Sequence, residues 1–200
     1  MQANTFAQLG LSQSMIDALN KKGFEEPSPI QSLVIPEFLK EQSNIIGQAQ
    51  TGTGKTAAFA LPILQLMDAN KKPNQRREIK ALILAPTREL ATQISDNFKE
   101  YGANLGFKHA VIFGGVSQFH QVVALKTGID ILIATPGRLL DLMNQGIIKL
   151  GSVEYFVLDE ADRMLDMGFI HDMKKVIAKL PVKRQTMFFS ATAAPNIRSE

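Results

Sequence analysis

The 200-residue chain contains no cysteine, which excludes a disulfide framework, a thiolate zinc site and a cysteine nucleophile. Histidine is scarce, and His109, His120 and His171 show no metal-ligand spacing, so we expect structural or surface roles for them. Residues 1–22 lack a basic start followed by an apolar core, which argues against a signal peptide. The longest apolar stretch, 57–67, is too short to span a bilayer. We therefore expect a soluble, cytoplasmic protein.

Neither sign of charge dominates the chain, which contains 22 Lys and Arg residues and 19 Asp and Glu residues and has a net charge of +3. This balance is compatible with phosphate ligands, but it is too weak to establish nucleic-acid binding. Hydrophobic residues make up 45% of the chain and charged residues 20%, which excludes disordered, collagen-like and fibrous proteins. The composition is that of a globular domain.

Short apolar runs alternate with segments of helical spacing along the whole chain. Two of these runs, 81–85 and 131–134, are apolar on both faces, which is typical of strands inside a parallel sheet. The alternation predicts an α/β doubly wound, mainly parallel sheet with helices on both faces. Strands are expected at 44–47, 81–85, 109–113, 130–134, 155–158 and 186–189, and helices at 55–67, 88–101, 117–126, 137–143 and 170–180. A further helix is expected near the start, between Ser12 and Gly23.

A glycine-rich sequence follows the first of these strands and opens a helix. Glycines there permit positive φ, so that successive backbone N–H groups can point at an anion, and the helix N-terminus adds its positive end. Lys55 can reach the β- and γ-phosphates of a nucleotide, and the Thr56 hydroxyl can bind Mg²⁺. Ala49 stands where the strict pattern has glycine, so the match is to a relaxed phosphate-binding loop. We expect nucleotide contacts from Gln50, Thr51, Gly52, Thr53, Gly54, Lys55 and Thr56.

The acidic sequence Asp159-Glu160-Ala161-Asp162 comes directly after the predicted strand 155–158. Carboxylates at the carboxyl end of a parallel strand face the crevice where α/β sheets bind ligands. We assign Asp159 to hold Mg²⁺ through water, and Glu160 to orient or deprotonate the attacking water. Taken alone, the tetrad could equally be a helix N-terminus favoured by its dipole. The phosphate-binding loop upstream favours the catalytic interpretation.

In their order and spacing these motifs resemble the first RecA-like domain of a bacterial DEAD-box RNA helicase, from Phe6 to Thr192. The resemblance implies a RecA-like P-loop NTPase domain that uses ATP and Mg²⁺. It implies an adenine-reading segment, the Q motif, within residues 1–32, packed on a helicase domain at 33–200. It also implies a second RecA-like domain, absent from this chain, that carries an arginine-bearing loop.

The resemblance identifies residues 23–31 as the Q motif and assigns Phe6, Phe24 and Gln31 to the nucleotide. A glutamine amide can donate to adenine N7 and accept from the N6 amino group, whereas guanine offers a second acceptor, O6. We therefore expect discrimination for ATP over GTP. By similarity Phe6 stacks on the base. From the residues alone, Phe6 could equally be a helix staple and Gln31 a solvent-facing side chain.

Three further loops follow predicted strand ends, and the family uses them to hold the sugar-phosphate backbone of single-stranded RNA. Backbone N–H groups at helix starts, threonine hydroxyls and arginines can bind phosphates without reading base identity. Without the resemblance, each loop would be interpreted as a simple strand-to-helix turn. The expected RNA contacts are Pro86, Thr87, Arg88, Gly114, Gly115, Thr135, Pro136, Gly137 and Arg138.

Ser190 and Thr192 follow the last predicted strand. In the family this motif couples hydrolysis to strand separation, with its hydroxyls bonded to the last acid of the tetrad, here Asp162. Hydroxyl donors and a carboxylate acceptor suit such a link, although either hydroxyl would also be an ordinary helix cap.

A polar insert at residues 70–78 carries Lys71, Lys72, Arg76 and Arg77 around Pro73. We interpret it as a solvated surface loop rather than a dedicated nucleic-acid contact.

The resemblance predicts the ATP-binding half of an ATP-dependent RNA helicase that unwinds short duplexes locally and hydrolyses little ATP on its own. Two alternatives remain open: an ATP-gated RNA clamp or scaffold, and a DNA translocase on the same fold. A kinase or small GTPase is disfavoured, because no guanine-reading Asn-Lys-x-Asp sequence is present.

Overall fold

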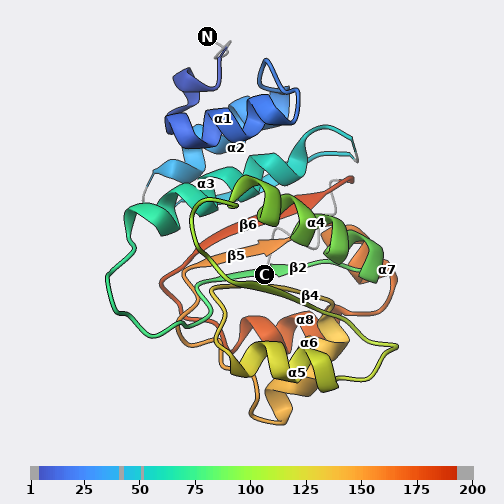
Figure 1. The fold of residues 1–200 in the computed structure, drawn as a ribbon. Helices are drawn as coiled ribbons and strands as arrows, with labels where there is room; N and C mark the ends of the chain where they lie inside the picture. The colour runs from blue at the N-terminus through green and yellow to red at the C-terminus, as the bar shows by residue number, and fades with distance from the viewer. Residues whose placement is uncertain (1–4, 41–42, 51, 193–200) are drawn as a thin grey trace.

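The centre of the molecule is a six-stranded, all-parallel sheet with strand order β1-β6-β5-β2-β4-β3 (Figure 1). The computed structural model describes residues 5–40, 43–50 and 52–192. The strands are β1 (Asn44–Gln48), β2 (Ala81–Leu84), β3 (His109–Ile112), β4 (Ile131–Ala134), β5 (Tyr155–Leu158) and β6 (Gln185–Ser190). The predicted α/β doubly wound architecture is confirmed.

The position of each strand in the sheet follows its residue pattern. Every residue of β2, β4 and β5 is buried, as expected of apolar strands covered on both faces. The edge strand β1 alternates exposed and half-buried residues. Because successive side chains point to opposite faces, Ile83 packs into one core cluster and its neighbours Leu82 and Leu84 into the other.

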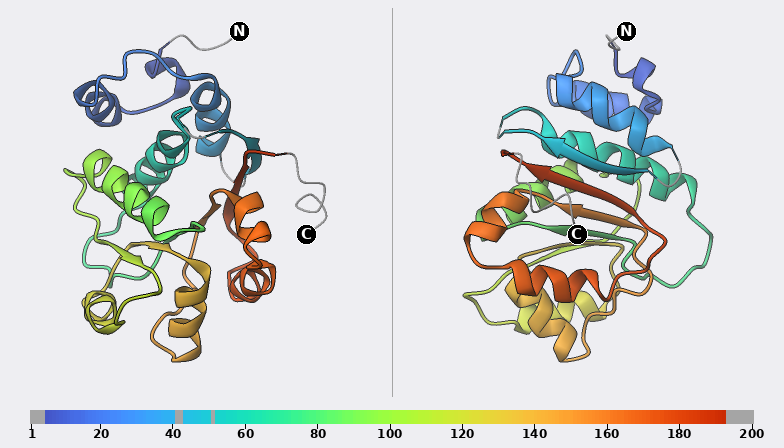
Figure 2. Two further views of the ribbon diagram at one scale, coloured as in Figure 1. Left: turned by 90° about the vertical axis from the view of Figure 1, so that its right-hand side faces the viewer. Right: turned by 180° about the vertical axis from the view of Figure 1, so that it is seen from behind.

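Two helical layers enclose the sheet (Figures 1 and 2). The first comprises α1, α2, α3 and α4, whose apolar residues share one core cluster with one face of the strands. The second comprises α5, α6, α7 and α8, which pack into the other cluster. The helices are η1 (Ala7–Leu9), α1 (Gln13–Lys21), α2 (Pro29–Leu39), α3 (Lys55–Ala69), α4 (Arg88–Tyr101), α5 (Phe119–Lys126), α6 (Pro136–Asn144), α7 (Ala161–Asp166) and α8 (Ile170–Ile177).

Helix α2 is absent from the sequence-based assignment, which treated its first residues as a nucleotide motif. Ser28 is the N-cap, and its side chain and that of Gln31 form a reciprocal capping box with Pro29 at the first helical position. The helix packs along α3, which carries the phosphate-binding loop at its start. The capping box thus sets the position of Gln31 beside that loop.

Helix α8 ends at Ile177, three residues before the predicted end at Leu180. Pro181 follows, and a residue that precedes proline is disfavoured in the helical region, so the chain leaves the helix before it. Among the residues that the structure describes, no helix combines the length and apolar character needed to cross a membrane.

Candidate functional site

The glycine-rich loop between β1 and α3 has the backbone geometry of a phosphate-binding loop. Gly52 and Gly54 adopt φ values of 83° and 79°, and Gly54 is the N-cap of α3. A β-carbon on Gly54 would collide with the amide of Gln31, so glycine is required there for two reasons. The Thr53 hydroxyl donates to the Gln50 carbonyl at 2.7 Å and closes the turn. Thr51, also expected in this loop, lies outside the described residues.

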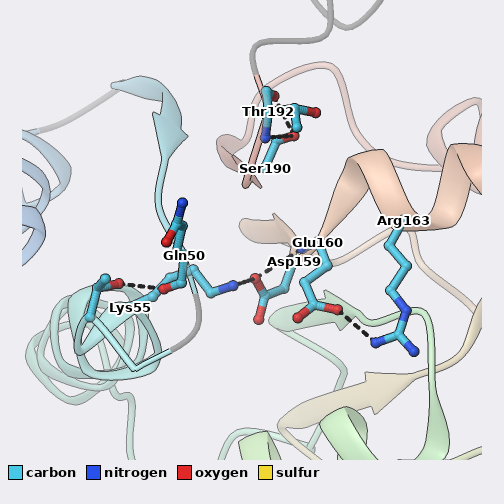
Figure 3. Close-up of polar contacts among 8 residues, drawn as sticks. Gln50, Lys55, Asp159, Glu160, Arg163, Ser190 and Thr192 are labelled. Atoms are coloured by element: carbon cyan, nitrogen blue, oxygen red, sulfur yellow. Dashed lines mark hydrogen bonds and ion pairs between the residues drawn. The ribbon is translucent and has the colours of Figure 1, made fainter.

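Lys55, the first residue of α3, contacts Asp159, which directly follows β5 (Figure 3). Lys55 Nζ lies 2.7 Å from Asp159 Oδ1, with 8% and 0% of the two side chains exposed. The same Oδ1 accepts a hydrogen bond from the backbone N–H of Glu160 at 3.0 Å. The other oxygen, Oδ2, is buried and has no hydrogen-bond partner among the described residues. The loop and the acids, about 100 positions apart in the sequence, therefore share one site.

Burial raises the pKa of the Asp159 carboxyl above its ordinary value, and the Lys55 ammonium offsets part of this increase. A buried carboxylate is costly unless its charge and both its oxygens are satisfied. Lys55 compensates one oxygen, and none of the described residues donates a hydrogen bond to the other or pairs a cation with it. This electrostatic arrangement favours a cation at Oδ2.

Glu160 holds a backbone conformation that side-chain-bearing residues rarely adopt. Its φ of 52° and ψ of 49° place it in the left-handed region at the N-cap of α7, which costs about 1–3 kcal/mol. The turn directs its carboxylate to Arg163, whose Nη1 lies 3.4 Å from Glu160 Oε2 (Figure 3). Strain of this kind clusters at active sites, where surrounding structure maintains it.

A cavity of about 180 Å³ opens between the loop and the acids, lined by Ala49, Lys55, Glu160, Asp162, Arg163 and Ala191. The described residues contain no cluster of three or more His, Cys, Asp or Glu that would hold a metal ion unaided. Mg²⁺ commonly uses one or two protein carboxylates and takes its remaining ligands from water and substrate phosphates. The unpaired Oδ2 of Asp159, together with Thr56 on the first turn of α3, fits that requirement.

The resemblance implies that the hydroxyls of Ser190 and Thr192 bond to Asp162, and among the described residues this contact is present for Thr192 but not for Ser190. The Thr192 hydroxyl donates to Asp162 Oδ2 at 3.2 Å. The Ser190 hydroxyl instead donates to the Thr192 carbonyl at 2.6 Å and accepts from the Thr192 N–H at 3.3 Å (Figure 3). Thr192 makes the direct link to the acid, whereas Ser190 shapes the turn that positions Thr192.

Gln31 is buried, with 1% of its surface exposed, so the solvent-facing alternative is wrong. Its Nε2 donates to the Gly54 carbonyl at 3.1 Å, and its Oε1 accepts from the Ser28 N–H at 3.0 Å. The amide lies against the phosphate-binding loop with a donor and an acceptor in use. An interaction with adenine would exchange or share these two bonds.

Phe6 is 3% exposed and belongs to the core cluster beneath the N-terminal helices. Phe24 is half-buried against the same cluster. Both rings contribute to packing in this structure. Their contact with a nucleotide base stays a prediction.

The three loops expected to bind RNA follow β2, β3 and β4, which adjoin one another in the order β2-β4-β3. Because the strands are parallel, the loops lie at the same edge of the sheet. Thr87 caps α4 by accepting from the Leu90 N–H at 3.2 Å, and Pro136 occupies the first turn of α6. Two helix N-termini thus border this edge and provide backbone donors.

The two arginines of these loops differ in their surroundings. Arg88 is exposed, and its guanidinium lies 4.7 Å from the centre of the Phe113 ring. Arg138 donates to Gln121 Oε1 at 3.0 Å and to the Val116 carbonyl at 2.7 Å, which holds the loop of Gly114 and Gly115 in place. Sequence reasoning missed Val116 and Gln121, which carry no recognisable motif.

A protein-family model described as DEAD/DEAH box helicase matches residues 28–199 of this chain. ATP-dependent RNA helicase CshA of Limosilactobacillus reuteri is 46% identical over 96% of this chain and 38% of its own length. The corresponding Geobacillus kaustophilus protein is 44% identical over 97% of this chain and 40% of its own length. A crystal structure of a DEAD box protein from the hyperthermophile Methanococcus jannaschii superposes with a TM-score of 0.90 at 43% identity, covering 99% of this chain and 53% of that one. The chain spans about half or less of the length of the curated relatives it matches.

Proposed function

Because this chain belongs to the DEAD/DEAH box helicase family, we propose that it is the ATP-binding part of an ATP-dependent RNA helicase. The observation that carries the proposal is the contact between Lys55 Nζ and Asp159 Oδ1, while Oδ2 has no partner among the described residues. This pair puts the cation needed for phosphates beside the carboxylate needed for a metal ion.

In the proposed cycle, the Lys55 ammonium leaves Asp159 and binds the β- and γ-phosphates of ATP. Gly52, Thr53 and Gly54 supply backbone N–H groups to the phosphates, and Thr56 and Asp159 hold Mg²⁺, the latter through water. Mg²⁺ supplies charge neutralisation at the phosphates. Glu160, fixed by its left-handed backbone, orients or deprotonates the water that attacks the γ-phosphorus.

We propose that single-stranded RNA lies along the loops after β2, β3 and β4. Helix N-termini, Thr87, Arg88 and Thr135 would contact its phosphates, so binding would be independent of base sequence. Arg138 would act partly through the loop that it holds. The link from Thr192 to Asp162 would couple the nucleotide site to this surface, and closure of a second RecA-like domain over the strand would unwind a short duplex.

The test uses this chain joined to a second RecA-like domain. We expect single-stranded RNA to stimulate its ATPase activity strongly and single-stranded DNA to stimulate it weakly. Equal stimulation would favour a DNA translocase. Unwinding of a short RNA duplex distinguishes a helicase from an ATP-gated clamp. A clamp would bind the RNA in the presence of ATP but would not release the complementary strand.

Replacing Gln31 with alanine is expected to lower the preference for ATP over GTP by roughly 10-fold, the effect of about one hydrogen bond. Calorimetric affinities of the chain for both nucleotides measure this ratio. Gln93→Ala, which removes an exposed amide from α4, is the matched control and should leave the ratio unchanged. If the Gln31→Ala variant kept the full preference for ATP over GTP, other residues would have to recognise the base.

A further inference from the structure

A second, larger cavity lies at the edge of the sheet opposite the nucleotide site. Its volume is about 1330 Å³, and its walls come from segments that precede β2, β5 and β6. In Figure 1 the long loop between α3 and β2 lies at the left of the molecule and α7 at the right, and the reverse view in Figure 2 shows the same separation. We call this feature the amino-edge cavity.

Cations outnumber acids around the amino-edge cavity, seven to three. Two of the acids are already paired, Asp130 with Arg77 and Glu154 with Lys80, the latter at 3.7 Å. The third, Glu78, accepts a hydrogen bond from the Ser152 hydroxyl at 2.8 Å. The cations are Lys71, Lys72, Arg76, Arg77, Lys80, Lys183 and Arg184.

Three of these cations, Lys72, Arg76 and Lys183, are exposed and have no ion-pair partner within residues 5–40, 43–50 and 52–192. Arg184 adds an unmet donor: its Nε is buried without a hydrogen-bond partner among the described residues, while its Nη1 donates to the Pro181 carbonyl at 2.8 Å. The cavity therefore carries positive charge that the described chain does not compensate.

The wall that bears these charges is fixed by contacts with other loops. Lys71 Nζ donates to the Leu105 carbonyl at 2.5 Å and lies 4.9 Å from the centre of the Phe107 ring. Arg77 donates to the Gly106 carbonyl at 3.3 Å. These contacts hold the insert against the loop before β3, so the cavity is preformed.

Apolar side chains form part of the lining, and the accessible ones include Pro73, Phe107 and Pro181. Neither of the two lining aromatic rings is fully exposed, since Tyr155 is buried and Phe107 is half-buried beneath Lys71. Many proteins that bind single-stranded nucleic acids stack the bases on exposed aromatic rings, and the described residues of the lining offer no such ring. The RNA loops also lie at the opposite edge of the sheet.

We propose that the amino-edge cavity binds an acidic peptide segment of a partner protein, one that also carries apolar side chains. Its carboxylates would pair with Lys72, Arg76 and Lys183, and its apolar side chains would pack on Pro73, which is exposed, and on Pro181, which is half-buried. Charge complementarity and this accessible apolar lining are the two features that select this ligand over a phosphate backbone. The site does not depend on the nucleotide chemistry of the opposite edge.

The test measures binding of a fluorescein-labelled, glutamate-rich dodecapeptide with two leucines and one phenylalanine to the 200-residue chain by fluorescence anisotropy. Combining Lys72→Glu, Arg76→Glu and Lys183→Glu is expected to weaken binding at least 10-fold. The matched control combines Lys21→Glu, Lys99→Glu and Lys175→Glu, exposed helix positions that do not line the cavity and that change the net charge equally, and it should retain the affinity. Circular dichroism melting checks that both variants are folded.

Absence of binding, or an equal loss in the two triple variants, would overturn the proposal. A labelled single-stranded oligouridylate serves as the competing probe. If it bound more tightly than the peptide and lost affinity only in the cavity variant, the cavity would be a nucleic-acid site and the peptide assignment would be wrong.

Discussion

Joining this chain to a second RecA-like domain is expected to raise its rate of ATP hydrolysis by about 10³–10⁵-fold, the effect of an arginine finger. The cations that line the nucleotide cavity already have acidic partners: Lys55 is paired with Asp159, and Arg163 with Glu160. Once Lys55 binds the phosphates, a further positive charge is needed where charge develops in the transition state. We expect the second domain to supply it.

Single-turnover assays with saturating ATP, Mg²⁺ and single-stranded RNA compare the two proteins directly. A Glu160→Gln variant of the two-domain protein is the control, because it should bind ATP and RNA while losing hydrolysis by ~10²–10⁴-fold. Comparable turnover by the 200-residue chain alone would show that this domain completes the reaction unaided.

Lys55→Ala is expected to weaken ATP binding at least ~100-fold, because it removes the only cation that the loop itself offers to the phosphates. It also leaves the Asp159 carboxylate buried without its ion-pair partner, a change that costs about 3–5 kcal/mol. The pKa of Asp159, already raised by burial, should rise further without the offsetting ammonium. A folded-state pKa above the unfolded value of about 3.9 means that the variant loses stability as the pH rises.

Calorimetry with ATP and Mg²⁺, and urea unfolding at pH 5 and pH 8, measure the two effects of Lys55→Ala separately. Adding Asp159→Asn should restore stability at pH 8 without restoring ATP affinity, because the buried charge is removed while the phosphate contact stays absent. Lys21→Ala, at an exposed position, should behave as the unaltered chain. An unchanged affinity in Lys55→Ala would refute the assignment of the phosphate-binding loop.

The sheet could be predicted from sequence because its strands carry their own signal. The apolar runs of β2, β4 and β5 require burial on both faces, and a parallel sheet between helix layers meets this requirement. Two elements gave weaker signals. Helix α2 has apolar residues around most of its circumference, and α7 has six residues, so neither shows a clear helical period.

The meeting of the glycine-rich loop with the acids could be predicted, because both follow strands of one parallel sheet. The partners of individual side chains could not be predicted. Lys55 contacts Asp159 directly, and Gln31 bonds Gly54, because these groups satisfy one another within the chain. The strained backbone of Glu160 has no sequence signature, since glutamate has no preference for the left-handed region.

The role of the polar insert at residues 70–78 could likewise be predicted only in part. Its residues 71–78 are exposed, which confirms its position on the surface. Its role as the wall of a cavity depends on contacts with Leu105, Gly106 and Ser152, which come from loops far away in the sequence. Composition alone therefore could not distinguish a solvated loop from one side of a binding site.

A crystal structure of the chain with Mg²⁺ and a non-hydrolysable ATP analogue would show directly whether Lys55 and Asp159 share the nucleotide. We expect Lys55 Nζ to move from Asp159 to the β- and γ-phosphates, Thr56 Oγ1 to bind the metal, and Asp159 to reach the metal through water. Triphosphate bound away from residues 52–56, or Lys55 still paired with Asp159 beside a bound nucleotide, would refute this nucleotide site.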